Sequence, residues 1–197
     1  MVLGDIFSDS VGIAIWQRQP QPLVETYFDA AFAALGLGVN GVYSVATMRD
    51  ELARDLPDGP NKQEAIADIF LLSDMLTCLF DCEQVGLRVV PLKKAMCPRF
   101  HVDNIPVRLV NTYLGEGSDW LPLEVLQNSP NGVKGESLNR KTLGQYNSEE
   151  HVQRLNRFDV GLLKGKAWPG HEHLAAVHRS CPVAADAKRV LLTLDPM

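Results

Sequence analysis

Apolar residues recur with helical spacing in the N-terminal third of the chain. Residues 23–36 carry a stripe of apolar side chains that stops at a glycine, and residues 44–60 carry a shorter one that ends in a proline- and glycine-rich turn. The strongest pattern covers residues 61–81, where Asn61 is a candidate N-terminal cap. The sequence therefore predicts three helices before residue 82.

Short alternating or β-branched runs replace this pattern in the rest of the chain. They cover residues 85–92, 98–103, 107–115, 158–165 and 188–195. Residues 121–150 are polar with weak periodicity, which predicts a long loop with a functional or mobile role. No linker separates the mainly helical residues 1–82 from the β-rich residues 83–197. We therefore expect a single domain over residues 1–197.

Composition limits the possible partners and surroundings. The 197 residues are 46% hydrophobic and 22% charged, which is typical of a soluble globular protein. The net charge of -5 and the dispersed lysines and arginines disfavour nucleic-acid binding. The N-terminus lacks the features of a secretory signal, and no apolar run is long enough to cross a membrane. We expect a cytoplasmic protein, with no membrane partner and an oligomeric state that the sequence leaves open.

His101 and Asp103 are the first candidates for a metal site. If residues 98–103 are extended, side chains two positions apart lie on the same face, so both groups can reach one ion. The motif is short and occurs often by chance. The alternative is therefore an ordinary solvated pair near a turn.

A third ligand is available near the C-terminus, after a strand and a glycine-rich turn at residues 165–170. His178 would complete a set of two histidines and one carboxylate, which suits non-haem Fe(II) because it leaves coordination positions open. His171 and His173 compete for the same role. On the last strand Arg189 can present a guanidinium group that binds a carboxylate in bidentate fashion.

The four cysteines, Cys78, Cys82, Cys97 and Cys181, are expected to be free thiols. Cys97 lies four residues before His101, and Cys181 lies three residues after His178. Either thiolate could approach the metal, and its presence would favour zinc. The alternative is that both are small side chains that pack between strands.

The order of these motifs resembles the double-stranded β-helix of Fe(II)/2-oxoglutarate-dependent oxygenases. The motifs are an HxD pair, a strand, a long loop, a GKAWPG turn, a distal histidine and a later arginine. The stretches CPRFHVDNIPVRLVNTYLGEGSDWL, LLKGKAWPG, VHRSCP and RVLLTLD are similar to the bacterial family catalogued as domain of unknown function 1826. The N-terminal stretch IFSDSVGIAIWQR fits the same family, so this resemblance covers nearly the whole chain.

The oxygenase resemblance implies roles for six residues. His101, Asp103 and His178 would bind Fe(II), and Arg189 would hold the far carboxylate of 2-oxoglutarate. Asn111 and Tyr113 would form hydrogen bonds with this cosubstrate. Many oxygenases have a serine or threonine two residues after the arginine, whereas this chain has Leu191 there and Thr193 two residues further on.

The expected fold is α+β, with N-terminal helices packed on a double-stranded β-helix of the jelly-roll or cupin type. The leading hypothesis is an Fe(II)/2-oxoglutarate-dependent oxygenase that hydroxylates a small-molecule or peptide substrate. The second is a non-catalytic zinc-binding protein linked to metal homeostasis, with a closed shell of four ligands. A third is a binding module with an empty site.

Overall fold

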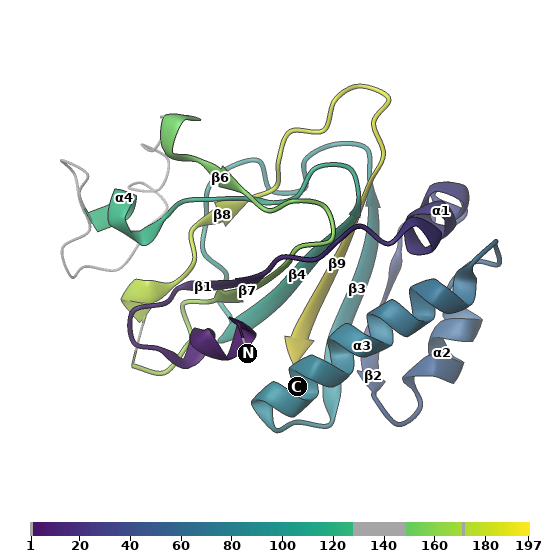
Figure 1. Cartoon of the computed structure of the whole chain (residues 1–197), viewed down its shortest axis with the longest axis horizontal. Helices are drawn as coiled ribbons and strands as arrows, with labels where there is room; N and C mark the ends of the chain where they lie inside the picture. Colours follow the sequence, from purple (N-terminus) through teal and green to yellow (C-terminus); the bar gives the residue numbers. More distant parts are fainter. Residues whose placement is uncertain (1, 128–148, 171) are drawn as a thin grey trace.

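An antiparallel six-stranded sheet organises the chain in the computed structural model, which describes residues 2–127, 149–170 and 172–197. The strand order is β1-β7-β4-β9-β3-β2 (Figure 1). The strands are Ile13–Trp16 (β1), Val39–Ser44 (β2), Gln84–Leu92 (β3), Val107–Leu114 (β4), Val160–Lys164 (β7) and Arg189–Pro196 (β9). A smaller sheet, in the order β6-β5-β8, contains Asp119–Trp120 (β5), Gln153–Arg154 (β6) and His178–Arg179 (β8).

Three helices cover one side of the large sheet, and the small sheet lies on the other side (Figure 1). The helices are Pro22–Ala31 (α1), Met48–Asp55 (α2) and Lys62–Phe80 (α3); the remaining helical segments are Leu123–Gln127 (α4), Val2–Phe7 (η1), Glu149–His151 (η2) and Glu172–Leu174 (η3). The three predicted helices are confirmed, although α1 ends earlier than expected because residues 32–37 form turns. Asn61 is at the N-cap position of α3, as predicted, but it has a left-handed conformation and its side chain makes no capping hydrogen bond.

Alternation along the strands separates a helix-facing surface from a second surface. On β3, β4 and β9 the buried apolar side chains against the helices include Leu87, Val89, Leu109, Tyr113, Leu192 and Leu194. The alternate positions of the same strands turn towards the small sheet, where Val110 and Leu163 pack against Leu155 and Ala176. The sequence predicted these alternating strands correctly. It did not predict which face the helices would cover.

The structure bears out the expected fold in part. The chain has the predicted mixture of helices and antiparallel strands, but in its described residues the large sheet is open, with β1 and β2 at its edges. Both edge strands come from the part predicted as mainly helical. They were missed because β1 has only four residues and β2 contains Asn40 and Gly41, so neither gives a clear alternating pattern.

Two further predictions concern an expected strand at residues 98–103 and an expected loop at residues 121–150. The expected strand at residues 98–103 is reduced to one bridge residue, His101, because a bend at residues 104–106 ends the extended segment. Most of the predicted loop at residues 121–150 lies outside the described residues.

In the described part of the chain, no helix has the length and apolar character needed to cross a bilayer.

A buried ion pair connects the end of β1 with α3 and the sheet. Arg18 pairs with Asp68, and the side chains of the two residues are 5% and 7% exposed. The Tyr113 hydroxyl donates a hydrogen bond to the same carboxylate at 2.9 Å. Burial, assisted by Asp68, raises the pKa of Tyr113 well above its ordinary value. Asp68 is therefore the acceptor that makes this polar cluster compatible with the core.

We expect Asp68→Ala to destabilise the fold by about 3–5 kcal/mol, because it leaves a buried guanidinium group without its carboxylate. Urea unfolding followed by circular dichroism measures the change. Asp74→Ala, at an exposed position of the same helix, is the matched control and should change the free energy of unfolding by less than about 0.5 kcal/mol. Equal effects of the two variants would contradict the structural role of Asp68.

Candidate metal centre and its cavity

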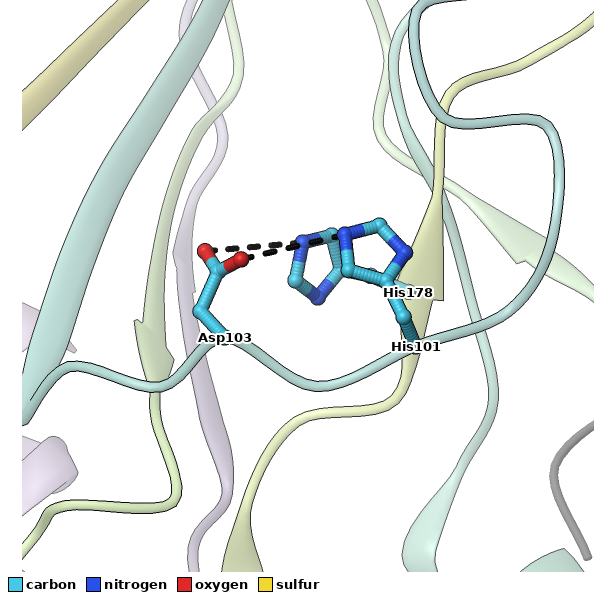
Figure 2. A group of neighbouring side chains, drawn as sticks. All are labelled: His101, Asp103 and His178. Atoms are coloured by element: carbon cyan, nitrogen blue, oxygen red, sulfur yellow. Dashed lines mark ion pairs between the residues drawn. The ribbon is translucent and has the colours of Figure 1, made fainter. Parts of the chain in front are cut away.

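Two histidines far apart in the sequence are paired directly by their backbones. The His101 N–H donates to the His178 carbonyl at 2.9 Å, and the His178 N–H donates to the His101 carbonyl at 2.9 Å. An antiparallel pair of this kind places both side chains on the same side of the ladder. The two imidazole rings consequently lie next to each other, with centroids 4.5 Å apart (Figure 2).

Each imidazole is oriented by a carbonyl two residues earlier. His101 Nδ1 lies 3.0 Å from the Arg99 carbonyl, and His178 Nδ1 lies 3.0 Å from the Ala176 carbonyl. Because a carbonyl only accepts, Nδ1 carries a proton in both rings, so Nε2 is the ring nitrogen that can bind a metal ion. Burial lowers the pKa of His178, partly offset by Asp103, so the neutral form that binds metals is favoured.

Asp103 completes the cluster (Figure 2). Its carboxylate oxygens lie 3.7 Å from His101 Nε2 and 3.8 Å from His178 Nε2, and one donor atom from each of the three residues lies within 4.8 Å of the others. Ligand atoms about 2.1 Å from one cation are about 3.0–3.5 Å apart. The three side chains therefore fit a single metal ion after a small contraction.

Arg108, which lies on β4 of the large sheet, holds the carboxylate of Asp103. Its Nη1 donates to Asp103 Oδ2 at 2.9 Å, while Nε and Nη2 bind Asp195 at 2.8 and 2.7 Å. The hydrogen bonds that Arg108 donates to Asp195 are the main reason that the pKa of Arg108 is raised. The bidentate pair with Asp195 holds the Arg108 guanidinium group in place. The single hydrogen bond from Arg108 to Asp103 therefore fixes Oδ2 and leaves Oδ1 available.

The GKAWPG turn holds the backbone that carries Asp103. Gly165 N–H donates to the Pro106 carbonyl at 2.7 Å, and Lys166 N–H donates to the Asp103 carbonyl at 2.8 Å. A Cβ atom at Gly165 would lie 1.9 Å from the Ile105 carbonyl oxygen, so only glycine allows this approach. The turn that the sequence singled out therefore acts through its backbone.

A cavity of about 150 Å³ extends from this cluster along the free face of the sheet. The lining residues are Arg88, Val90, Met96, Cys97, His101, Asp103, Arg108, Val110, Ser118, His178, Ser180, Arg189, Leu191 and Thr193. Arg189, Leu191 and Thr193 line it together, as their alternation on β9 predicted. A cavity this small suits a compact ligand, since pockets that hold drug-sized ligands have volumes of roughly 300 Å³ or more.

Arg189 is the most deeply buried cation of this cavity, with only 1% of the residue exposed. Its guanidinium group donates to the Glu116 carbonyl at 2.7 Å and to the hydroxyls of Ser180 at 2.8 Å, Ser118 at 3.2 Å and Thr112 at 3.5 Å. Burial lowers its pKa, but an arginine stays charged. None of these four hydrogen-bond partners is a carboxylate.

Two residues with an expected cosubstrate role face away from the cavity. The Asn111 amide donates to the carbonyls of Phe158 and Asp159, and Tyr113 donates to Asp68 on the helix side of the sheet. They occupy the odd-numbered positions of β4, whereas Arg108 and Val110 line the cavity from the even-numbered ones. The alternation itself would have shown this once the helix-covered face was known.

The cysteines and the other histidines differ in position. Cys97 lines the cavity, and Cys181 is buried with its thiol directed to the Glu116 carbonyl, but among the described residues neither belongs to the metal-binding group. His173 lies in η3 and is also outside that group. His171 falls outside the described residues, so its competition with His178 stays untested.

Sequence reasoning missed the residues that surround the predicted ones. Arg108, Ser118 and Ser180 were not singled out, although Arg108 alternates with Val110 on a predicted strand. Ser118 and Ser180 lie outside any periodic pattern, beside β5 and β8, and their positions follow only from the packing of the two sheets.

The family of the chain follows from its sequence. Residues 1–195 match the family described as "Protein of unknown function (DUF1826)", and the chain belongs to that family. No curated protein matches the sequence.

Solved structures share the fold at low sequence identity. The dioxygenase for auxin oxidation from rice is similar with a TM-score of 0.54 and 13% identity, over 96% of this chain and 74% of that one. A putative oxygenase from Shewanella oneidensis is similar with a TM-score of 0.52 and 10% identity, over 98% of this chain and 84% of that one. SnoN, a non-heme alpha ketoglutarate dependent epimerase from nogalamycin biosynthesis, is similar with a TM-score of 0.50 and 12% identity, over 98% of this chain and 80% of that one. The chain thus has an oxygenase-like fold.

We expect His178→Gln to weaken divalent metal binding roughly 100-fold or more, because changes outside the ligand shell already cost about 10–100-fold. Competition with a chromogenic chelator measures the affinity. His173→Gln removes a neighbouring histidine outside the group and should leave the affinity within about twofold. A loss of binding in His173→Gln but not in His178→Gln would reverse the assignment.

We expect Gly165→Ala to weaken metal binding and to destabilise the fold, because the added methyl group displaces the backbone that carries Asp103. Thermal unfolding and metal titration measure both effects. Gly4→Ala is the control, since nothing lies within 4 Å of a Cβ atom at that position. Normal metal affinity in Gly165→Ala would show that this contact does not position Asp103.

Proposed function

We propose that this protein is a non-haem Fe(II)- and 2-oxoglutarate-dependent oxygenase that acts on a small-molecule or peptide substrate. The observation that carries the proposal is the pairing, in one cavity, of the His101, Asp103 and His178 cluster with a buried guanidinium group that, among the described residues, donates no hydrogen bond to a carboxylate. Each part alone has ordinary structural explanations. Together they match the two binding requirements of this class of enzyme.

His101, Asp103 and His178 would hold the metal. Two imidazoles and one carboxylate suit Fe(II) and leave positions on the ion for other ligands. Bound Fe(II), together with 2-oxoglutarate and O2, would supply the oxidising chemistry. The protein contributes orientation: the Arg99 and Ala176 carbonyls fix the two rings, and Arg108 fixes the carboxylate.

Arg189 would hold the far carboxylate of 2-oxoglutarate. The oxygens that accept hydrogen bonds from this guanidinium group are uncharged, so a carboxylate that enters the cavity gains a strong charge-assisted interaction. Leu191 cannot provide the hydroxyl that many oxygenases place two residues after this arginine. In this chain the hydroxyls of Ser180 and Ser118, which already contact the guanidinium group, are available instead.

Apolar side chains also line the cavity. They include Val90, Val110 and Leu191. Such a lining would exclude water around a bound cosubstrate and would strengthen the electrostatic interactions within the cavity. The residues of this chain would thus bind, orient and shield the reacting groups.

The zinc-binding alternative receives less support. A closed zinc site has four protein ligands, often including thiolates, whereas the group in the described residues has three members and no cysteine. An open ligand set is typical of a catalytic rather than a structural metal. The experiment that follows tests the oxygenase proposal, and its failure would favour the metal-binding alternative.

We expect anaerobic Fe(II)-loaded protein to bind 2-oxoglutarate and to develop a visible charge-transfer band. Arg189→Lys should weaken 2-oxoglutarate binding at least about tenfold, because a lysine cannot provide the bidentate contact. Fe(II) affinity and the melting temperature report whether the variant folds. Fe(II) binding that 2-oxoglutarate leaves unchanged in the wild-type protein would refute the oxygenase and favour a metal-binding protein.

A further inference from the structure

Arg88 is a third arginine of the cavity, and the proposed function gives it no role. It lies on β3, in register with Thr193 of β9, and shares the cavity face with Val90. Unlike Arg189 it is exposed, so it lies where the cavity opens to solvent. Within residues 2–127, 149–170 and 172–197, the Arg88 side chain has no hydrogen-bond or ion-pair partner.

Arg88 and Arg189 lie on different sides of the cavity. Arg189 pairs with Leu92 on β3, four residues along the strand from Arg88, which corresponds to about 13 Å. The guanidinium group of Arg189 is held by Thr112 of β4 and by Ser118, on the side of β9 opposite to β3. One carboxylate held at Arg189 therefore leaves Arg88 available.

The charges of the cavity leave one cation unbalanced. Arg108 is bound to Asp103 and Asp195, and these are the carboxylates of this face that contact an arginine of the cavity. A divalent metal ion and a doubly charged 2-oxoglutarate cancel each other. Three guanidinium groups then face two carboxylates, and the remaining positive charge is at the exposed Arg88.

We propose that Arg88 binds the anionic group of the primary substrate, which is a small organic acid with a carboxylate or a phosphate. This inference rests on the proposed function, because it assigns the remaining part of the same cavity. The exposed guanidinium group captures the oxyanion at the opening of the cavity. The organic part of the acid then extends over Val90, Val110 and Thr193 towards the metal cluster.

The test uses the full chain loaded with Mn(II) and 2-oxoglutarate, without O2. Acetate, butyrate, benzoate and N-acetylglycine are each titrated beside the corresponding primary amide, and phenyl phosphate beside phenol, with ligand-observed NMR. The variants are Arg88→Gln, Arg189→Lys and the matched control Arg54→Gln, an exposed arginine on α2 behind the sheet. Each titration is repeated on metal-free protein.

We expect at least one acid to bind about tenfold more tightly than its neutral counterpart, and Arg88→Gln to remove that difference. Arg54→Gln should retain it. Affinity for 2-oxoglutarate should stay within twofold in Arg88→Gln and fall in Arg189→Lys. A preference for phenyl phosphate over every carboxylate identifies the oxyanion as a phosphate ester and supports the same role.

The proposal is overturned if no acid binds better than its neutral counterpart, or if Arg88→Gln binds the acids as the wild-type protein does. It is also overturned if Arg88→Gln loses 2-oxoglutarate and Arg189→Lys does not. If the wild-type protein does not bind 2-oxoglutarate but binds acids through Arg88, the oxygenase proposal is refuted and the role of Arg88 in binding an acid is retained. The failure of the substrate proposal and the failure of the proposed function therefore give different results.

Discussion

The antiparallel pairing of His101 with His178 is the constraint on which the candidate site depends. Two backbone hydrogen bonds join a segment between β3 and β4 to the short strand β8, and the geometry of such a pair directs both imidazoles to the same side. Nearby carbonyls then fix the rings, and Arg108 fixes Asp103. These contacts do not involve a metal, so the protein itself orients the three candidate ligands.

A second constraint is electrostatic. The cavity is lined by a carboxylate, two imidazoles and a buried guanidinium group, together with apolar side chains. Hydroxyl and carbonyl oxygens stabilise Arg189 enough for it to remain buried, but they do not neutralise its charge. On the proposed function, the three candidate ligands would hold a cation and Arg189 would hold an anion in the same cavity.

The similarity to oxygenase structures establishes a shared fold, and a fold alone does not assign a reaction. The argument for function instead depends on side chains of this chain: three candidate metal ligands, one buried arginine and one exposed arginine. Arg88 and Arg189 project from the face of the large sheet that the helices leave uncovered, His178 lies on the small sheet, and His101 and Asp103 lie in the segment between β3 and β4. The fold thus explains where a site can form, and the residues explain what it can bind.

The sequence by itself determined the long helix α3, the alternating strands β3, β4, β7 and β9, and the motif residues His101, Asp103, His178 and Arg189. These signals are local, because periodicity and short motifs need only neighbouring residues. Tertiary structure decided the open sheet with its edge strands, and it decided which face of each strand lines the cavity. Asn111 and Tyr113 lie on the other face because α1 and α3 cover it, and Ser118 and Ser180 reach Arg189 only because two sheets pack together. Alternation defines two faces of a strand, but only packing against other elements decides which of them becomes core and which becomes site.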